Sequence, residues 1–105
     1  MEKVIRDGKV AVLYSPGWGA GWYSWHGMEE LLYHPTLVQM VEDGQRLDIT
    51  NELCNSILGK GRRVVVMGEE NLTIEWLPIG TEFIIDEYDG NESITLKGNT
   101  NWLTA

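Results

Sequence analysis

Aromatic side chains and glycines crowd one short stretch of the chain, between Tyr14 and His26. Indole and phenol rings offer flat faces on which a base or a sugar ring can stack. Closely spaced glycines leave backbone N–H groups open to a phosphate or a carboxylate. The stretch makes a poor strand and a poor helix, so it predicts a loop that forms the wall of a site for a flat, polar ligand.

Within this stretch, Trp18, Trp22 and Trp25 are the expected stacking residues, and the glycine amides are the expected anion donors. The candidate ligand-binding residues here are Tyr14, Ser15, Gly17, Trp18, Gly19, Gly21, Trp22, Trp25 and His26. An alternative stays open, because tryptophans are mostly buried in folded proteins. Trp22 and Trp25 would then be core residues beneath a sheet, and the glycines would simply let the loop turn.

The known nucleotide-binding and catalytic motifs are not matched. Trp22 occupies the position of the third glycine in the dinucleotide fingerprint, and a Gly-Lys-Ser/Thr sequence is absent. His26 and His34 have no Cys or His at ligand spacing, so we expect no metal and no cofactor. Cys54 lies in an apolar run and is expected to be a small buried side chain. These patterns favour a binding protein over an enzyme.

Two further groups could take part in binding. Arg62 and Arg63 belong to the basic cluster of the chain, and arginine makes bidentate contacts with phosphate. The alternative is a solvated pair at the start of a strand. Tyr88 and Asp86 share one face of a predicted strand, which could place a phenol and a carboxylate beside a ligand. The alternative there is a polar sheet edge protected against pairing.

The net charge of -8 is unevenly distributed. Residues 68–105 contain eight acids and a single base, Lys97. Such a field repels duplex nucleic acid and anionic membranes, so we expect neither as a partner. The acidic part could instead face a basic protein, or be a solvated surface. Because no apolar run is long enough for a membrane span or a signal peptide, we expect a cytoplasmic protein.

The pattern of apolar residues and turns predicts a single α+β domain over residues 1–105. Asp7-Gly8 predicts a hairpin within residues 4–14. Short helices are expected in 28–34, 35–44 and 50–59, and strands at 63–67, 72–76, 81–88, 93–97 and 101–103. We therefore predict an antiparallel meander sheet of about five or six strands, with a small helical insertion packed on one face.

The motif Ser15-Pro16-Gly17-Trp18-Gly19-Ala20-Gly21-Trp22, with Ile74-Glu75-Trp76-Leu77-Pro78-Ile79-Gly80 and Glu87-Tyr88-Asp89-Gly90, resembles a family of small bacteriophage and bacterial proteins. The resemblance covers nearly the whole chain and carries over no catalytic residue. It implies a phage anti-defence factor that acts in the host cytoplasm. One class of such factors sequesters cyclic oligonucleotides or ADP-ribose derivatives made by host immune systems.

Together these observations predict a homo-oligomeric sponge that binds a nucleotide-derived signal without cleaving it. Two alternatives stay open. One is an acidic protein that inhibits a host enzyme through residues 68–105. The other is a carbohydrate- or peptide-binding module, in which the neutral donors matter and Arg62 does not.

Overall fold

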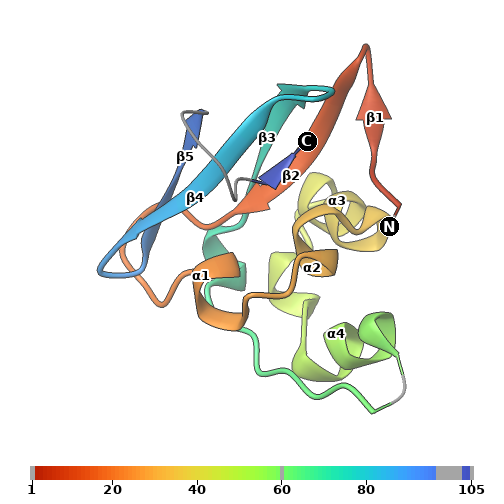
Figure 1. Ribbon diagram of the computed structural model, residues 1–105. Helices are drawn as coiled ribbons and strands as arrows, with labels where there is room; N and C mark the ends of the chain where they lie inside the picture. The colour runs from red at the N-terminus through yellow and green to blue at the C-terminus, as the bar shows by residue number, and fades with distance from the viewer. Residues whose placement is uncertain (1, 60, 97–102, 105) are drawn as a thin grey trace.

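The computed structural model describes residues 2–59, 61–96 and 103–104 of the chain. Its strands form two three-stranded antiparallel sheets, which lie at an angle to each other in Figure 1. Sheet A has the order β1-β2-β3 and sheet B the order β5-β4-β6. The strands are β1 (Ile5–Arg6), β2 (Lys9–Tyr14), β3 (Thr73–Pro78), β4 (Glu82–Tyr88), β5 (Asn91–Leu96) and β6 (Leu103–Thr104).

Two tight turns of the same kind connect β1 to β2 and β4 to β5. Asp7 and Gly8 have φ values of 51° and 75°, and Asp89 and Gly90 have values of 53° and 84°. Two consecutive residues with positive φ define the type I′ turn, whose twist matches that of the flanking strands. The hairpin predicted around Asp7-Gly8 is therefore confirmed.

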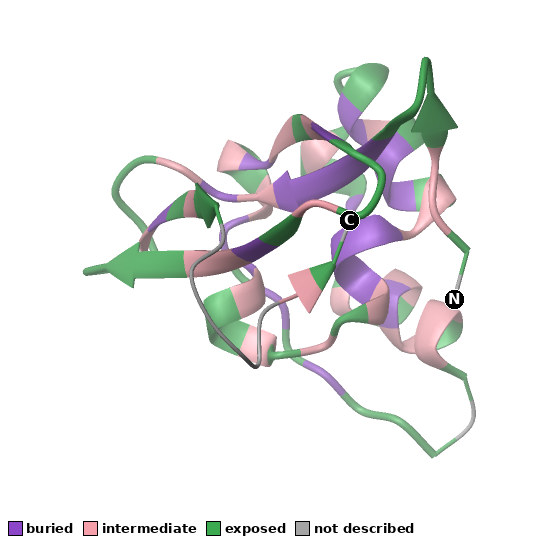
Figure 2. Ribbon diagram, turned by 45° about the horizontal axis from the view of Figure 1, so that its top comes forward, coloured by how far each residue is buried: buried purple, intermediate pink, exposed green. Residues whose placement is uncertain are grey.

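β2 is the centre of the molecule, and it is buried on both faces. Ala11 and Leu13 pack into one core cluster with the helices, and Val10 and Val12 pack into a second cluster with Phe83 of sheet B. Figure 2 shows the middle of β2 buried, from Val10 to Leu13, whereas the far end of the β4–β5 hairpin is exposed.

The segment between β2 and β3 contains short helices. They are α1 (Tyr23–His26), α2 (Glu30–Tyr33), α3 (Pro35–Glu42), η1 (Arg46–Asp48), α4 (Asn51–Leu58) and η2 (Glu69–Asn71). Pro35 starts α3, and the Thr50 hydroxyl accepts from the amide of Leu53 to cap α4, so both helices lie within the ranges 35–44 and 50–59 predicted for them. None of the helices within the described residues is long and apolar enough to cross a membrane.

The α+β class is confirmed, but the single meander sheet is wrong. β3 pairs with β2 along its whole length and has no pairing with β4. Pro78 ends β3, and the turn through Gly80 sends the chain into a second sheet. Phe83 can then be buried against Val10 and Val12, which a flat continuation of sheet A would not allow. The sequence showed which residues alternate, and alternation does not reveal which strands pair.

The predicted strand at 63–67 is also wrong, because this segment has no strand partner. Its inward-facing residues Val64 and Val66 are buried, and their amides donate to Asn55 Oδ1 and Asn51 Oδ1 at 2.6 and 2.8 Å. Side chains of α4 thus occupy the place of a neighbouring strand. The predicted strand at 101–103 lies mostly outside the described residues, of which Leu103 belongs to β6.

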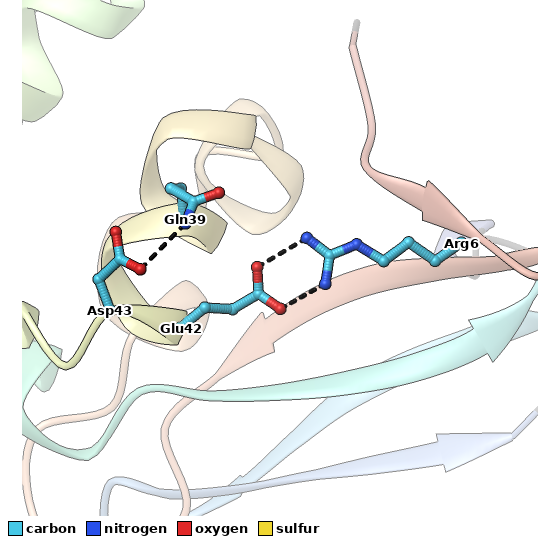
Figure 3. A network of polar contacts seen from close by, with 4 residues as sticks. All are labelled: Arg6, Gln39, Glu42 and Asp43. Atoms are coloured by element: carbon cyan, nitrogen blue, oxygen red, sulfur yellow. Dashed lines mark hydrogen bonds and ion pairs between the residues drawn. The ribbon is translucent and has the colours of Figure 1, made fainter.

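An exposed ion pair ties β1 to the end of α3 (Figure 3). The Arg6 guanidinium donates to both oxygens of Glu42, at 2.5 and 2.8 Å, and lies 5.1 Å from the centre of the Trp76 ring. The hydrogen bond between Arg6 and Glu42 lowers the pKa of the Glu42 carboxyl and raises that of Arg6. Exposed ion pairs of this kind contribute little to the free energy of unfolding, so we expect the fold not to depend on this contact.

Candidate functional site

A buried carboxylate organises the loop that follows β2. Glu92 is 1% exposed, and its oxygens accept from the amides of Ser15, Trp22 and Ser24 at 2.8, 2.9 and 2.8 Å. The Ser24 hydroxyl adds a fourth bond at 2.6 Å, and the amide of Glu92 itself donates to the Ser15 carbonyl at 3.0 Å. One side chain from β5 therefore fixes both ends of the aromatic loop.

The glycines of the loop allow backbones to touch. A Cβ atom on Gly90, at the tip of the β4–β5 hairpin, would lie 1.5 Å from the carbonyl oxygen of Gly19. A Cβ on Gly68 would lie 2.3 Å from the carbonyl oxygen of Gly21. Two segments distant in the sequence thus press on the loop, and glycine is required where they meet.

These contacts occupy part of the predicted anion cradle. The amide of Gly17 donates to Asn91 Oδ1 at 2.8 Å, and Gly21 is buried beneath Gly68. Ser15 is also buried, and its hydroxyl donates to the Gly68 carbonyl at 3.0 Å. Gly19 is exposed but has its carbonyl against Gly90. The polar groups of this loop mainly hold it together.

Trp22 is a core residue, so the prediction that it stacks on a ligand does not fit the structure. Its side chain is fully buried, and Nε1 donates to the carbonyl of Leu31 at 3.0 Å. A buried indole needs a partner for its single N–H, and the start of α2 provides one. The alternative interpretation, a tryptophan beneath the sheet, is the one the structure supports here.

His26 lies half-buried at the end of α1, edge-on to the Trp22 ring at 4.8 Å between centroids. Its Nδ1 accepts from the amide of Met28 at 2.8 Å. Burial lowers the pKa of His26 to about 4, so the imidazole is neutral at pH 7. Its Nε2 is buried and has no hydrogen-bond partner among the described residues. His26 is therefore a packed neutral ring rather than a poised general base.

Tyr14 and Trp25 lie at the two margins of the loop. Tyr14 ends β2 opposite Thr73, where burial and the charge of Glu75 raise the pKa of its hydroxyl. Trp25 lies on α1 and is 52% exposed. Trp25 keeps an accessible indole, whereas Tyr14 is half-buried in the sheet.

The exposed aromatic surface is formed by Trp18 and Tyr88. The two rings are arranged edge to face, with 6.4 Å between their centroids. Trp18 is 68% exposed and Tyr88 is 76% exposed. Asn71 Nδ2 donates to the Trp18 carbonyl at 3.4 Å, and Asn91 holds the preceding amide. We call Trp18 and Tyr88 the aromatic pair. They are distant in sequence and brought together by the hairpin.

Polar residues continue from the aromatic pair along the outer face of the hairpin. Strand pairing places Asp86 opposite Ser93 and Ile84 opposite Thr95 on the face that carries Tyr88. The Thr95 hydroxyl donates to the Asp86 carboxylate. Every charged residue between Glu82 and Leu96 is an acid. The aromatic pair therefore lies in an electronegative environment.

Arg62 and Arg63 lie elsewhere, beyond the C-terminal end of α4. Arg62 is 3.6 Å from the Glu30 carboxylate, and Arg63 has no ion pair among the described residues. Both line a hollow of about 620 Å³ together with Glu52, Asn55, Ser56, Gly59 and Gly61. No member of the aromatic pair lines it. Within one chain, the structure does not bring the aromatic pair into the hollow that the arginines line.

No catalytic arrangement stands out in the part of the chain that the structure covers. Burial, with the charge of Glu69, raises the pKa of the Cys54 thiol to about 11, which leaves it a thiol at neutral pH. No three His, Cys, Asp or Glu side chains gather as metal ligands within the described ranges.

Sequence reasoning missed Glu92 and Asn91, which hold the loop. A signal for Glu92 existed, since it shares a strand face with Ile94 in a period-two pattern. An acid on an otherwise apolar face requires buried partners. Asn91 carries no comparable signal.

Comparison with known proteins adds no relative: the chain matches no family model, no curated protein and no solved structure.

Proposed function

We propose that this chain is a binding protein that contacts a basic segment of a partner protein through the aromatic pair and the acids beside it. The observation that carries the proposal is the position of Trp18 and Tyr88. Both are largely exposed, and the Trp18 ring of the loop after β2 lies against Tyr88 of the β4–β5 hairpin, whose charged residues are all acidic.

Exposed aromatic rings of this size are the residues that most often dominate protein interfaces. A guanidinium or ammonium group can lie over such a ring and is attracted to its face. Asp86, together with the acids near the turn, adds long-range attraction for the same cation. The surface thus offers a stacking face and a complementary charge to an arginine or lysine side chain.

The same electrostatics disfavour a phosphate at the aromatic pair. Every charged residue of the β4–β5 hairpin is an acid, and the amides of Ser15, Gly17, Trp22 and Ser24 already donate within the protein. This supports the acidic protein-binding alternative over a nucleotide sponge at this surface. The phage anti-defence role that the resemblance implies is compatible with such a partner and stays a prediction.

Titration calorimetry with an arginine-rich peptide of about nine residues would test the proposal. Binding should weaken roughly tenfold, about 1.4 kcal/mol, for Trp18→Ala and for Tyr88→Ala. Asp86→Asn should weaken it less and reduce its dependence on salt. Leu47→Ala and Asp48→Asn remove an exposed apolar and an exposed acidic side chain on η1, and they serve as matched controls.

The proposal fails if the peptide does not bind, or if the η1 controls weaken binding as much as Trp18→Ala. A neutral oligosaccharide belongs in the same experiment. Saccharide binding that needs Trp18 and ignores both salt and Asp86→Asn would instead identify a carbohydrate module.

A nucleotide-derived ligand remains a second candidate because of the hollow beside α4. Its volume falls within the range of small-molecule sites, and Arg62 and Arg63 could bind phosphate there. Titration with cyclic dinucleotides and cyclic ADP-ribose derivatives would test it. Binding that is lost in Arg62→Ala and kept in Trp18→Ala would support this hollow. An absence of binding across the series would remove the candidate.

A further inference from the structure

The extended segment 63–67 has one edge occupied and one edge open. The amides of Val64 and Val66 point toward α4, where Asn55 and Asn51 accept them. In an extended chain, alternate residues direct their N–H and C=O groups to opposite edges. The groups of Val65 and Met67 therefore point away from α4, and no described residue accepts from their amides.

The side chains alternate in the same way. Val64 and Val66 are buried, whereas Val65 and Met67 are 59% and 40% exposed. Figure 1 shows the segment running along the margin of the molecule from α4 toward α1. An apolar extended segment with a free backbone edge is a template for an added strand.

Charges at the two ends of the segment indicate which strand it would accept. Arg62 and Arg63 precede the apolar residues, and Glu69 and Glu70 follow them. An antiparallel copy of the same segment would bring the arginines of each chain toward the glutamates of the other, with Arg62 diagonal to Glu70 across the pair. A parallel copy would place like charges side by side. The segment is thus complementary to itself in the antiparallel direction.

We propose that two copies of this chain pair through residues 63–67 as antiparallel strands around a two-fold axis. Val65 of one copy then faces Val65 of the second copy, and Arg63 faces Met67 of the second copy. In this register both partners are on the open edge and can exchange backbone hydrogen bonds. The two-fold pairing occupies the open edge of each copy, so no edge is left for a third chain and the assembly is a dimer.

The pairing also bears on the separated candidate residues. The acidic turn at η2 borders the aromatic loop, because Asn71 of η2 donates to the Trp18 carbonyl. Arginines that arrive at this turn from the second copy would approach Trp18 from the other chain. The dimer would therefore reduce the separation between arginine and indole that exists within one chain.

Sedimentation equilibrium of the full chain over a range of concentrations would test the dimer. The wild type should dimerise, and Arg62→Glu and Glu70→Arg should each raise the dissociation constant at least about tenfold, or 1.4 kcal/mol. An equimolar mixture of the two variants should recover the wild-type affinity as a heterodimer, because every charge contact is then between opposite charges. Asp48→Arg, a charge reversal on η1, is the control and should leave the dissociation constant unchanged.

Amide exchange gives a second measurement that does not depend on any variant. On dilution below the dissociation constant, exchange should accelerate at Val65 and Met67 and remain constant at Val64 and Val66. The proposal would be overturned if the wild type were still monomeric at about 0.1 mM, because its dissociation constant would then be weaker than is typical of specific association. It would also be overturned by a mixture that does not recover dimerisation, or by protection at Val65 that is independent of concentration. None of these measurements uses a ligand, so their failure would leave the proposed function standing.

Discussion

Glu92 determines the shape of the aromatic loop although it lies outside it. Its carboxylate accepts four hydrogen bonds from Ser15, Trp22 and Ser24, and it is almost completely buried. Charge-assisted bonds to backbone amides are stronger than neutral ones, so the anionic form is well compensated. The loop depends on one residue from a distant strand.

Replacing Glu92 by Gln tests this dependence. The amide nitrogen of glutamine would face backbone donors, so we expect the free energy of unfolding to fall by about 2–4 kcal/mol. Chemical denaturation measures the change. Ser93→Ala, at the exposed neighbouring position, should change stability by less than about 0.5 kcal/mol. Equal effects of the two substitutions would contradict the role of Glu92.

His26 should make stability depend on pH. Its pKa is about 4 in the folded chain, against 6.5 for the free side chain. Between these values the unfolded state binds more protons, so stability is complete above about pH 6.5 and falls as the pH is lowered. The slope should be at most about 1.4 kcal/mol per pH unit.

The variant His26→Asn keeps a side-chain acceptor for the amide of Met28 and removes the titrating ring. The difference in unfolding free energy between wild type and variant should therefore shrink or change sign as the pH falls from 7 to 4. Urea titrations at several pH values would measure it. A constant difference would show that His26 is not the titrating group.

The sequence could locate the candidate site at residue scale but could not sort its tryptophans. Trp18 and Trp22 each follow a glycine in the same loop, yet Trp18 is 68% exposed and Trp22 is fully buried. The difference arises from the carbonyl of Leu31, which receives the Trp22 N–H. A contact between two elements cannot be recognised from the order of apolar and polar residues in either element.

At the scale of elements, the turn of the β4–β5 hairpin is fitted to the loop by a glycine. Gly90 has a φ of 84° and lies where a Cβ would collide with the Gly19 carbonyl. Gly8 occupies the equivalent turn position with a φ of 75°, and a Cβ there would meet nothing within 4 Å. The two turns thus share one backbone conformation and differ in their surroundings.

Comparing Gly8 with Gly90 separates the cost of a left-handed backbone from the cost of a steric clash with the loop. Gly8→Ala should cost about 1–2 kcal/mol for the left-handed backbone alone. Gly90→Ala should cost about 3 kcal/mol or more, because the Gly19 carbonyl must also move. Thermal unfolding would give both values. Similar losses would mean that the loop and the hairpin are not in contact at this point.

Local signals at this scale predicted turns and caps well and pairing poorly. Asp7-Gly8, Pro35 and Thr50 each act within a few residues of themselves, and the hairpin at Asp7-Gly8 and the helices within 35–44 and 50–59 were predicted correctly. The segment 63–67 has the composition of a strand, but its hydrogen-bond partners are Asn51 and Asn55. Side chains that replace a strand are indistinguishable in the sequence from ordinary helix residues.

At the scale of the whole molecule, β2 joins two core clusters that face opposite directions. The helices pack against Ala11 and Leu13, and sheet B packs against Val10 and Val12. Since one strand belongs to both clusters, loss of either exposes a face of β2. We therefore expect the chain to unfold as one cooperative unit.

The net charge of -8 should make salt stabilising. Repulsion among acids acts on the whole molecule, whereas the exposed Arg6–Glu42 pair gains little. We expect about 0.5 M NaCl to raise the free energy of unfolding by about 0.5–1 kcal/mol through screening. Denaturation in urea with and without NaCl would measure this. A decrease would show that attractive ion pairs outweigh the repulsion.

The tie between Glu92 and Ser15 spans 77 residues. Proteins are synthesised from the N-terminus, so the indoles of Trp18, Trp22 and Trp25 leave the ribosome long before the residue that anchors their backbone. During that interval the three indoles of the nascent chain are exposed, and the backbone that carries them lacks its Glu92 hydrogen bonds. A pause or a truncation upstream of residue 92 would leave it so, and the product would be a target for chaperones and proteases.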